Sequence, residues 1–171
     1  DKRLRQISKD ATFPLSKEYK KTIQHIIDEL TYSQIEEYAE KYNLRPGMGL
    51  AFPQLGINER IIVIVYEYDE GKFEEYVVIN PKIVSSSLEK IYVEDGEGCL
   101  SINRETCGIV PRYARITVEG YDTEGNKIKI RAREELAIAF QHEIDHLNGI
   151  LFFDHIDKNK RFYDESEMRL I

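Results

Sequence analysis

The sequence has few cysteines and no long uncharged apolar run, and each absence excludes a class of protein. Only two cysteines occur in 171 residues, Cys99 and Cys107, which is too few for a disulfide scaffold. No apolar stretch is long enough to cross a bilayer. The first residues, DKRLRQ, are polar and precede no apolar segment, so we expect no secretory signal. A cytoplasmic location with free thiols is the simplest expectation.

Positive charge is also in short supply. The chain has 24 Lys and Arg against 31 Asp and Glu, a net charge of −7. Affinity for polyanions depends on neutralising phosphates with basic side chains, so this balance argues against a broad phosphate-binding surface but not against a small basic patch. We expect no membrane partner and no direct nucleic-acid binding. The chain has no internal repeat or linker, and its length suits a single domain over residues 1–171.

Hydrophobic periodicity places helices towards the two ends and strands between them. Ser16 is positioned to cap a helix that runs through Leu30, and a second helical stretch covers residues 33–42. A last helix runs from Glu134 to about Asn148, where Gly149 can stop it. Strands are expected at 60–68, 75–79, 83–84, 91–93, 115–121 and 127–132, the last two joined as a hairpin through 122–126. Strands gathered before one late helix indicate an α+β fold.

The late helix carries His142-Glu143-Ile144-Asp145-His146, which matches the H-E-x-x-H pattern. At ~100° per residue, the two histidines fall within ~40° of each other and the glutamate lies beside them. The apolar residues fall in the opposite sector of this helix: Ala137, Phe140, Ile144 and Leu147. One face can therefore pack into a core while the other presents two imidazoles and a carboxylate to a metal. The bare motif is also compatible with a solvated helix.

A catalytic metal site usually has three protein ligands, so a third must come from elsewhere. A metzincin-like site would need a histidine at position 152, but that residue is Phe152, and His155 comes three residues too late. A thermolysin-like site would use Glu165 or Glu167 from the charged tail. The third candidate is Cys99, because flanking glycines let the backbone turn tightly and a thiolate suits zinc or iron(II).

Three segments together resemble the motifs of the peptide deformylase family. They are Gly47-Met48-Gly49-Leu50-Ala51-Phe52-Pro53-Gln54, Glu97-Gly98-Cys99-Leu100-Ser101 and Gln141-His142-Glu143-Ile144-Asp145-His146. The resemblance covers nearly the whole chain, and the chain is similar to the longer type 2 bacterial form of the family. It implies an α+β fold in which antiparallel β-sheets pack around a central helix that carries H-E-x-x-H.

The resemblance implies an enzyme that removes the N-formyl group from the formylmethionine of newly synthesised bacterial proteins and releases formate. One divalent metal, iron(II) by preference with zinc, nickel or cobalt able to substitute, would be held by Cys99, His142 and His146. Glu143 would be the general base and acid. The Gln54 amide and the Leu100 backbone N–H would stabilise the oxyanion. The implied substrate-binding residues are Gly49, Leu50, Glu97 and Gly98, and a transient association with the ribosome is also implied.

One position departs from the family pattern, which usually has alanine where this chain has Phe52. In extended geometry Leu50, Phe52 and Gln54 share one side of the backbone. The ring would then narrow the cleft or shift Gln54; alternatively, it packs inward and fills core space.

Three residues near the motifs, Asp145, Arg112 and His155, allow a purely structural role as well as a functional one. Asp145 either orients a partner or forms a surface salt bridge, and Arg112 is able to steady such a network. We expect His155 to be a structural histidine rather than a ligand.

Two other functions stay open on the residues alone: a zinc endopeptidase with a different third ligand, and a binding module with a structural metal. The latter needs a fourth nitrogen or sulfur ligand, and none stands at a persuasive spacing. Formate release from a formyl-Met tripeptide, compared with cleavage of a general peptide, distinguishes the two enzymes.

Overall fold

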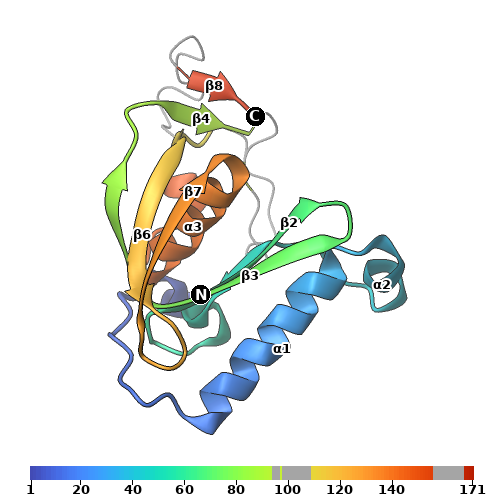
Figure 1. The fold of residues 1–171 in the computed structure, drawn as a ribbon, viewed down its shortest axis with the longest axis vertical. Coiled ribbons are helices and arrows are strands. Elements are labelled where there is room, and N and C mark those ends of the chain that lie inside the picture. The colour runs from blue at the N-terminus through green and yellow to red at the C-terminus, as the bar shows by residue number, and fades with distance from the viewer. Residues whose placement is uncertain (94–96, 98–108, 156–167) are drawn as a thin grey trace.

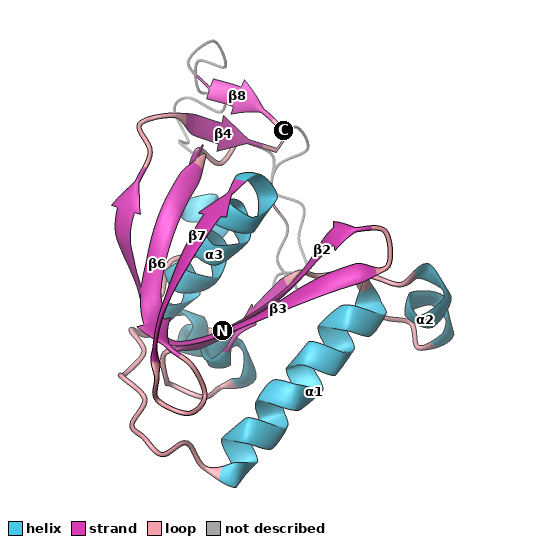
Figure 2. Ribbon diagram, in the orientation of Figure 1, coloured by secondary structure: helices cyan, strands magenta, loops and turns pink. Residues whose placement is uncertain are grey.

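The computed structural model describes residues 1–93, 97, 109–155 and 168–171, which form an α+β fold (Figure 1, Figure 2). In chain order the elements are η1 (Lys2–Arg5), α1 (Lys17–Ser33), α2 (Glu36–Lys41), β1 (Gly49–Ala51), η2 (Phe52–Leu55), β2 (Ile61–Asp69), β3 (Lys72–Ser86), β4 (Lys90–Tyr92), β5 (Arg112–Tyr113), β6 (Arg115–Tyr121), β7 (Lys127–Arg133), α3 (Glu134–Leu147), η3 (Phe152–His155) and β8 (Met168–Leu170). Among these described elements no helix has the length and apolar character needed to span a membrane.

The described strands form two sheets. The larger has the order β1-β2-β3-β6-β7, and all its neighbouring strands are antiparallel, as predicted. The smaller has the order β5-β4-β8. In it β4 pairs antiparallel with β5 but parallel with β8. The prediction of antiparallel sheets is therefore confirmed except at β8, a strand too short to show a period in the sequence.

The predicted caps and turns lie where the sequence puts them. The Ser16 side chain accepts a hydrogen bond from the Tyr19 backbone N–H, and α1 continues past Leu30 to Ser33. Beyond the end of α3, Gly149 has a φ of 71°, a left-handed value that favours glycine. The 122–126 turn closes the β6–β7 hairpin, with the Asp122 carboxylate accepting backbone bonds inside it.

One predicted break is absent. The strands expected on either side of Pro81 are a single strand, β3. Its register with β6 shifts between Ile79 and Lys82, and Asn80 has a φ of 53°. An irregularity of this kind accommodates a residue that has no N–H to donate to the ladder, so proline bends the strand instead of ending it.

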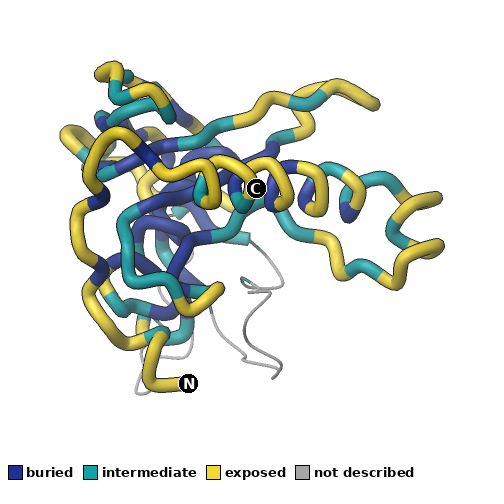
Figure 3. Tube along the Cα trace, turned by 90° about the horizontal axis from the view of Figure 1, so that it is seen from below, coloured by how far each residue is buried: buried dark blue, intermediate teal, exposed yellow. Residues whose placement is uncertain are grey.

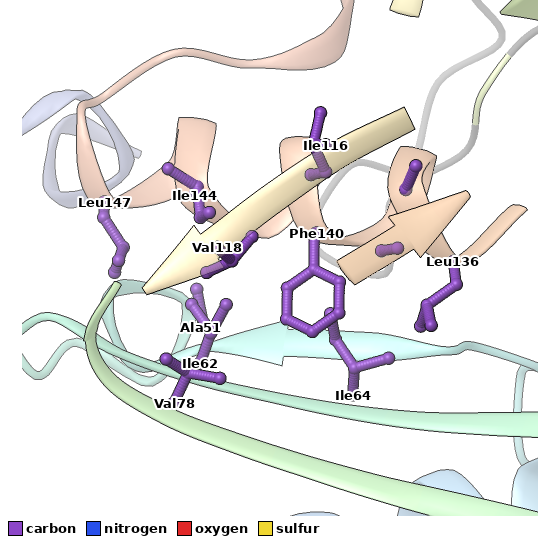
Figure 4. Close-up of a cluster of buried hydrophobic side chains, with 12 residues drawn as sticks. Ala51, Ile62, Ile64, Val78, Ile116, Val118, Leu136, Phe140, Ile144 and Leu147 are labelled. Carbon is purple, nitrogen blue, oxygen red and sulfur yellow. The ribbon is translucent and has the colours of Figure 1, made fainter. Parts of the chain in front are cut away.

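Strand β2 is buried on both faces, and one long helix packs on each. Its residues Ile62 and Ile64 belong to a core cluster with α3, in which the Phe140 ring lies beside Ile64 (Figure 4). Residues Ile61 and Val63 face the opposite way, into a second cluster. The apolar side of α1 completes that cluster, and the other side of the helix is exposed (Figure 3). Burial of each such side chain contributes about 1.5–3 kcal/mol, so the two helices are fixed on opposite faces of one sheet.

Phe52 belongs to the cluster on the α1 side. It is fully buried, and its ring meets that of Tyr19 edge-on at 5.5 Å between centroids. The prediction of extended geometry through Gln54 was wrong, because the strand ends at Ala51 and a 3-10 helix with Pro53 in its first turn begins at Phe52. Of the two alternatives stated for the ring, inward packing is the one observed.

Candidate metal centre

Helix α3 carries two imidazoles and a carboxylate into the interior of the protein. His142, Glu143 and His146 are 9%, 5% and 1% exposed. The two imidazole centroids lie 5.0 Å apart with the rings nearly perpendicular. The helical spacing thus brings both rings to one place, while Phe140 and Ile144 on the other side of α3 pack into the core. A solvated helix is excluded by this burial.

The Glu143 carboxyl group is buried where a negative charge is unfavourable. Burial raises its pKa from the ordinary value of 4.5 to about 7, although the nearby His142 and Arg112 favour the ionised form. Its Oε2 has no hydrogen-bond partner among the described residues. A carboxyl group with a pKa near 7 can both accept and return a proton at neutral pH.

His142 is oriented by a buried ion-pair network. Its Nδ1 lies 3.1 Å from Glu97 Oε1, and Arg112 makes two bonds of 2.8 Å to the same carboxylate. Arg112 also donates to Asp145 at 2.6 Å, and its side chain is only 3% exposed. Burial works to raise the pKa of Glu97, but the bonds from Arg112 and His142 outweigh it and hold that pKa below its ordinary value. Asp145 is thus one partner in this network rather than a member of an isolated surface pair.

The His146 ring is held in its neutral form. Burial, together with the charge of nearby His142, lowers its pKa from 6.5 to about 3. A neutral imidazole is the form that binds a metal. The carboxylate at Nδ1 of His142 is the usual second partner of a metal-binding histidine. His146 therefore fits a metal site in its protonation state, and His142 fits one in its contact with a carboxylate.

Several predicted site residues lie outside the described part of the chain: Gly98, Cys99, Leu100, Glu165 and Glu167. Among the described residues, no group of three His, Cys, Asp or Glu side chains gathers to hold a metal. The alternative ligand His155 is described, and its Nε2 lies 2.7 Å from Asp145 Oδ2. That contact agrees with the structural role expected for this histidine.

A cavity of about 470 Å³ opens beside the polar face of α3. Five of the predicted site residues line it: Gly49, Gln54, Glu97, His142 and Glu143. The Gln54 side chain is oriented by the end of β1, since its Oε1 accepts a bond of 2.8 Å from the Ala51 N–H. Leu50 lies in β1, and its side chain packs towards the α1 cluster. Residues of all three motifs therefore line one cavity.

A family model described as polypeptide deformylase matches residues 1–162. The chain belongs to the polypeptide deformylase family. It is 46% identical over 159 residues to "Peptide deformylase 2" of Bacillus anthracis, covering 93% of this chain and 86% of that protein. It is 49% identical over 159 residues, with the same coverage, to "Peptide deformylase 2" of Bacillus subtilis strain 168.

Solved structures of deformylases share the fold. A probable peptide deformylase from Synechococcus phage S-SSM7 aligns with a TM-score of 0.72 and 35% identity over 91% of this chain and 94% of that one. The peptide deformylase of Thermotoga maritima aligns with a TM-score of 0.70 and 36% identity over 92% of both chains. The resemblance to the type 2 bacterial deformylases is thereby confirmed. This deformylase is an enzyme of a metal-dependent family that removes the N-formyl group from nascent polypeptides.

One residue that lines the deformylase cavity was not predicted from the sequence. Gln34, just beyond α1, lines it. Its Nε2 donates to the carbonyl oxygens of Gly47 at 3.0 Å and Val65 at 2.9 Å. The neighbouring Ser33 Oγ accepts a bond of 3.2 Å from the Gly47 N–H. A polar pair at the end of an amphipathic helix gives no local signal of such a contact, because its partners are distant in sequence.

Proposed function

We propose that this deformylase removes the formyl group from the N-terminal formylmethionine of nascent polypeptides through one divalent metal held by Cys99, His142 and His146. The observation that supports it best is the buried group on α3: two neighbouring imidazoles beside a carboxyl group whose pKa is about 7. Hydrolysis of an amide needs a base that works at neutral pH and is shielded from bulk water, and the Glu143 carboxyl group is 5% exposed with a pKa of about 7.

The proposed ligand set of one thiolate and two imidazoles suits iron(II) or zinc. We propose iron(II) as the metal in the cell, with zinc, nickel or cobalt able to substitute. When bound, such an ion supplies Lewis acidity that lowers the pKa of water and polarises a carbonyl group. Glu97 holds the His142 ring through Nδ1, so the ring presents Nε2 for coordination.

The residues around the metal site divide the proton transfers and the charge stabilisation between them. Glu143 takes a proton from the attacking water and then protonates the departing amine. The Gln54 side-chain amide and the Leu100 backbone N–H donate to the oxygen that becomes negative in the transition state. A donor of this kind contributes about 3 kcal/mol.

The enzyme recognises the main chain of its substrate, since beyond the formylmethionine nascent polypeptides share little else. Among the described strands, β1 has β2 as its one neighbour and forms an edge of the larger sheet. An extended peptide can add to such an edge through main-chain hydrogen bonds. Gly49 and Leu50 on β1 and the Glu97-Gly98 segment are the proposed contacts. The enzyme acts in the bacterial cytoplasm as one domain over residues 1–171, in transient association with ribosomes.

The test is Glu143→Gln, compared with Glu135→Gln on the same helix. Glu135 also lines the cavity but is exposed. We expect Glu143→Gln to keep its metal and lose formate release from a formyl-Met tripeptide by ~10²–10⁴-fold, while the control keeps its activity. Metal content by elemental analysis and formate by a coupled assay are the two measurements. Surviving turnover in Glu143→Gln would overturn the assignment of the base, and cleavage of unformylated peptides by the wild type would favour an endopeptidase.

A further inference from the structure

A strip of positive charge runs along the face of β7 that points away from α3. In Figure 1 strands β6 and β7 cross in front of α3. Side chains alternate along β7, where Ile128, Ile130 and Ala132 pack into the α3 cluster. The residues between them are all basic and exposed: Lys127, Lys129, Arg131 and Arg133.

One further cation, Lys82, comes from β3 on the far side of β6. Lys129 is paired with Glu119 of β6, and Glu119 is paired in turn with Lys82 of β3. Directly paired residues point to the same face of a sheet, so the exposed Lys82 joins the row. We call Lys82, Lys127, Lys129, Arg131 and Arg133 the basic strip.

Neighbouring carboxylates neutralise the basic strip only in part, since Glu119 stands between Lys129 and Lys82 on the same face and the charge of Arg133 acts on Glu134. None of its five side chains forms an ion pair or a hydrogen bond with a residue in the described part of the chain. By contrast, Arg115 beside the strip is paired with Glu89 at 3.1 Å. Arg115 and Arg133 are directly opposite each other in the ladder, and like charges in that position are destabilising. The bond from Arg115 to Glu89 offsets part of that repulsion.

A hollow of about 550 Å³ lies at the end of the sheet where Arg115 pairs with Arg133. Its lining includes the hydroxyl-bearing Ser85, Ser86 and Thr117, the three arginines Arg115, Arg131 and Arg133, and the core residues Ile116 and Ala132. Hydroxyl and guanidinium donors are the groups that bind phosphate oxygens. The hollow and the basic strip therefore favour the same class of ligand.

We propose that the basic strip and its hollow bind the phosphate backbone of RNA. Alternate residues on β7 place a cation every ~6.8 Å along the strand, a linear array that suits a repeating polyanion better than a single phosphate. The choice of RNA rests on the proposed function. The proposed substrates are nascent polypeptides, which are attached to ribosomes, and ribosomes expose RNA on their surface. The strip lies on the opposite side of the sheet from α3 and Glu143, so an RNA bound there leaves the cavity open.

Net charge predicted no nucleic-acid binding, whereas this proposal is argued from the local arrangement of charge. A net charge of −7 is an average over the whole surface, whereas binding depends on the local arrangement of cations. The β-ladder collects basic residues of β3 and β7 on one face.

The test is the binding of a fluorescently labelled single-stranded RNA of ~16 nucleotides, measured by anisotropy over a range of salt concentrations. The strip variant carries Lys127→Gln, Lys129→Gln and Arg131→Gln. The control carries Lys2→Gln, Lys41→Gln and Lys72→Gln, three exposed lysines away from the strip. Both variants change the net charge equally, so only the position of the charge differs.

We expect the strip variant to bind RNA at least ~10-fold more weakly and to reduce the slope of log K against log salt by ~2, about 0.7 for each lost phosphate contact. The control should stay within ~2-fold of the wild type. Thermal unfolding checks the fold of both, and Arg131→Gln alone should reduce the slope by ~0.7 if the triple variant unfolds.

Three outcomes would overturn the proposal: no salt-dependent RNA binding by the wild type, an equal loss in both variants, or a loss of binding to phosphatidylserine vesicles or to an acidic peptide with RNA binding unchanged. Formate release from a formyl-Met tripeptide is measured on the same samples and should be unaffected in the strip variant. Failure of formate release in the wild type would count against the proposed function and leave the RNA measurement intact.

Discussion

The space around the Glu143 side chain is closed by the backbone of β1. A Cβ added at Gly49 would lie 2.9 Å from Glu143 Cγ and 3.0 Å from both Cδ and Oε1. Contacts this short do not persist, so the carboxyl group would have to move. Glycine at this position therefore allows the carboxylate to approach the sheet edge.

We predict that Gly49→Ala lowers kcat by ~10–100-fold, because a displacement of about 1 Å at a catalytic group is costly. The change in KM should be smaller. Steady-state formate release provides both constants. The control is Gly71→Ala, at a glycine with nothing within 4 Å of an added Cβ but with a φ of 72°, which should cost some stability and leave kcat unchanged. Equal kcat values for the Gly49 variant and the wild type would show that Glu143 is not confined by β1.

At the scale of elements, the end of α1 holds the segment that leads into β1. Gln34 joins the carbonyl oxygens of Gly47 and Val65, so it ties this segment to β2. We predict that Gln34→Leu raises KM for a formyl-Met tripeptide by ~3–10-fold with little change in kcat, since it loosens binding without touching the reacting atoms.

The matched control for that prediction is Gln24→Leu on the same helix. Gln24 is exposed and donates to Asp28, so its loss should not change KM. A fall in kcat with KM unchanged in Gln34→Leu would assign this residue to the chemistry instead of to substrate binding.

The C-terminal strand β8 is attached by one arginine to two carboxylates. Arg169 donates to Glu89 at 2.6 Å and to Glu134 at 2.6 and 2.8 Å. These bonds hold the pKa of both carboxyl groups below the ordinary value of 4.5. A lowered folded-state pKa stabilises the attached strand above pH 4.5 and loses that effect as the pH falls through the folded-state values.

We therefore predict that β8 loosens on acidification below pH 4.5. The amide of Ile171, which donates to the Tyr92 carbonyl oxygen at 3.1 Å, reports the change by NMR. In Arg169→Gln the same amide should shift already at neutral pH and respond less to acid. An Ile171 amide that is unchanged to pH 3 in the wild type would contradict this account.

For the molecule as a whole, the two core clusters lie on opposite faces of β2, and only the cluster that includes α3 residues is next to the proposed catalytic residues. We therefore expect a change in the α1 cluster to affect stability more than catalysis. Phe52 is fully buried in the cluster on the α1 side and does not line the cavity beside α3. We predict that Phe52→Ala lowers the free energy of unfolding by about 3–5 kcal/mol and changes KM by less than ~3-fold.

Urea unfolding and formate release from the same preparation check this prediction. Phe13→Ala is the control, because Phe13 is 38% exposed and should cost little. An altered preference for the size of the first side chain in Phe52→Ala would show that this ring shapes the pocket after all.

The sequence alone determined the local features of this protein. The capped start of α1, the β6–β7 hairpin and the glycine stop after α3 follow from short-range periodicity and turn chemistry. The H-E-x-x-H spacing likewise brings His142 and His146 together, since four residues make about one helical turn.

Only the tertiary structure decided the rest, because it depends on residues far apart in the chain. The inward direction of Phe52, the bonds from Gln34 to Gly47 and Val65, and the Glu97–Arg112 pair each need a partner from another element. A one-residue change of strand register would move every side chain to the other face of its sheet. The collection of cations from β3 and β7 on one outer face is therefore a property of the paired strands, which composition and net charge do not contain.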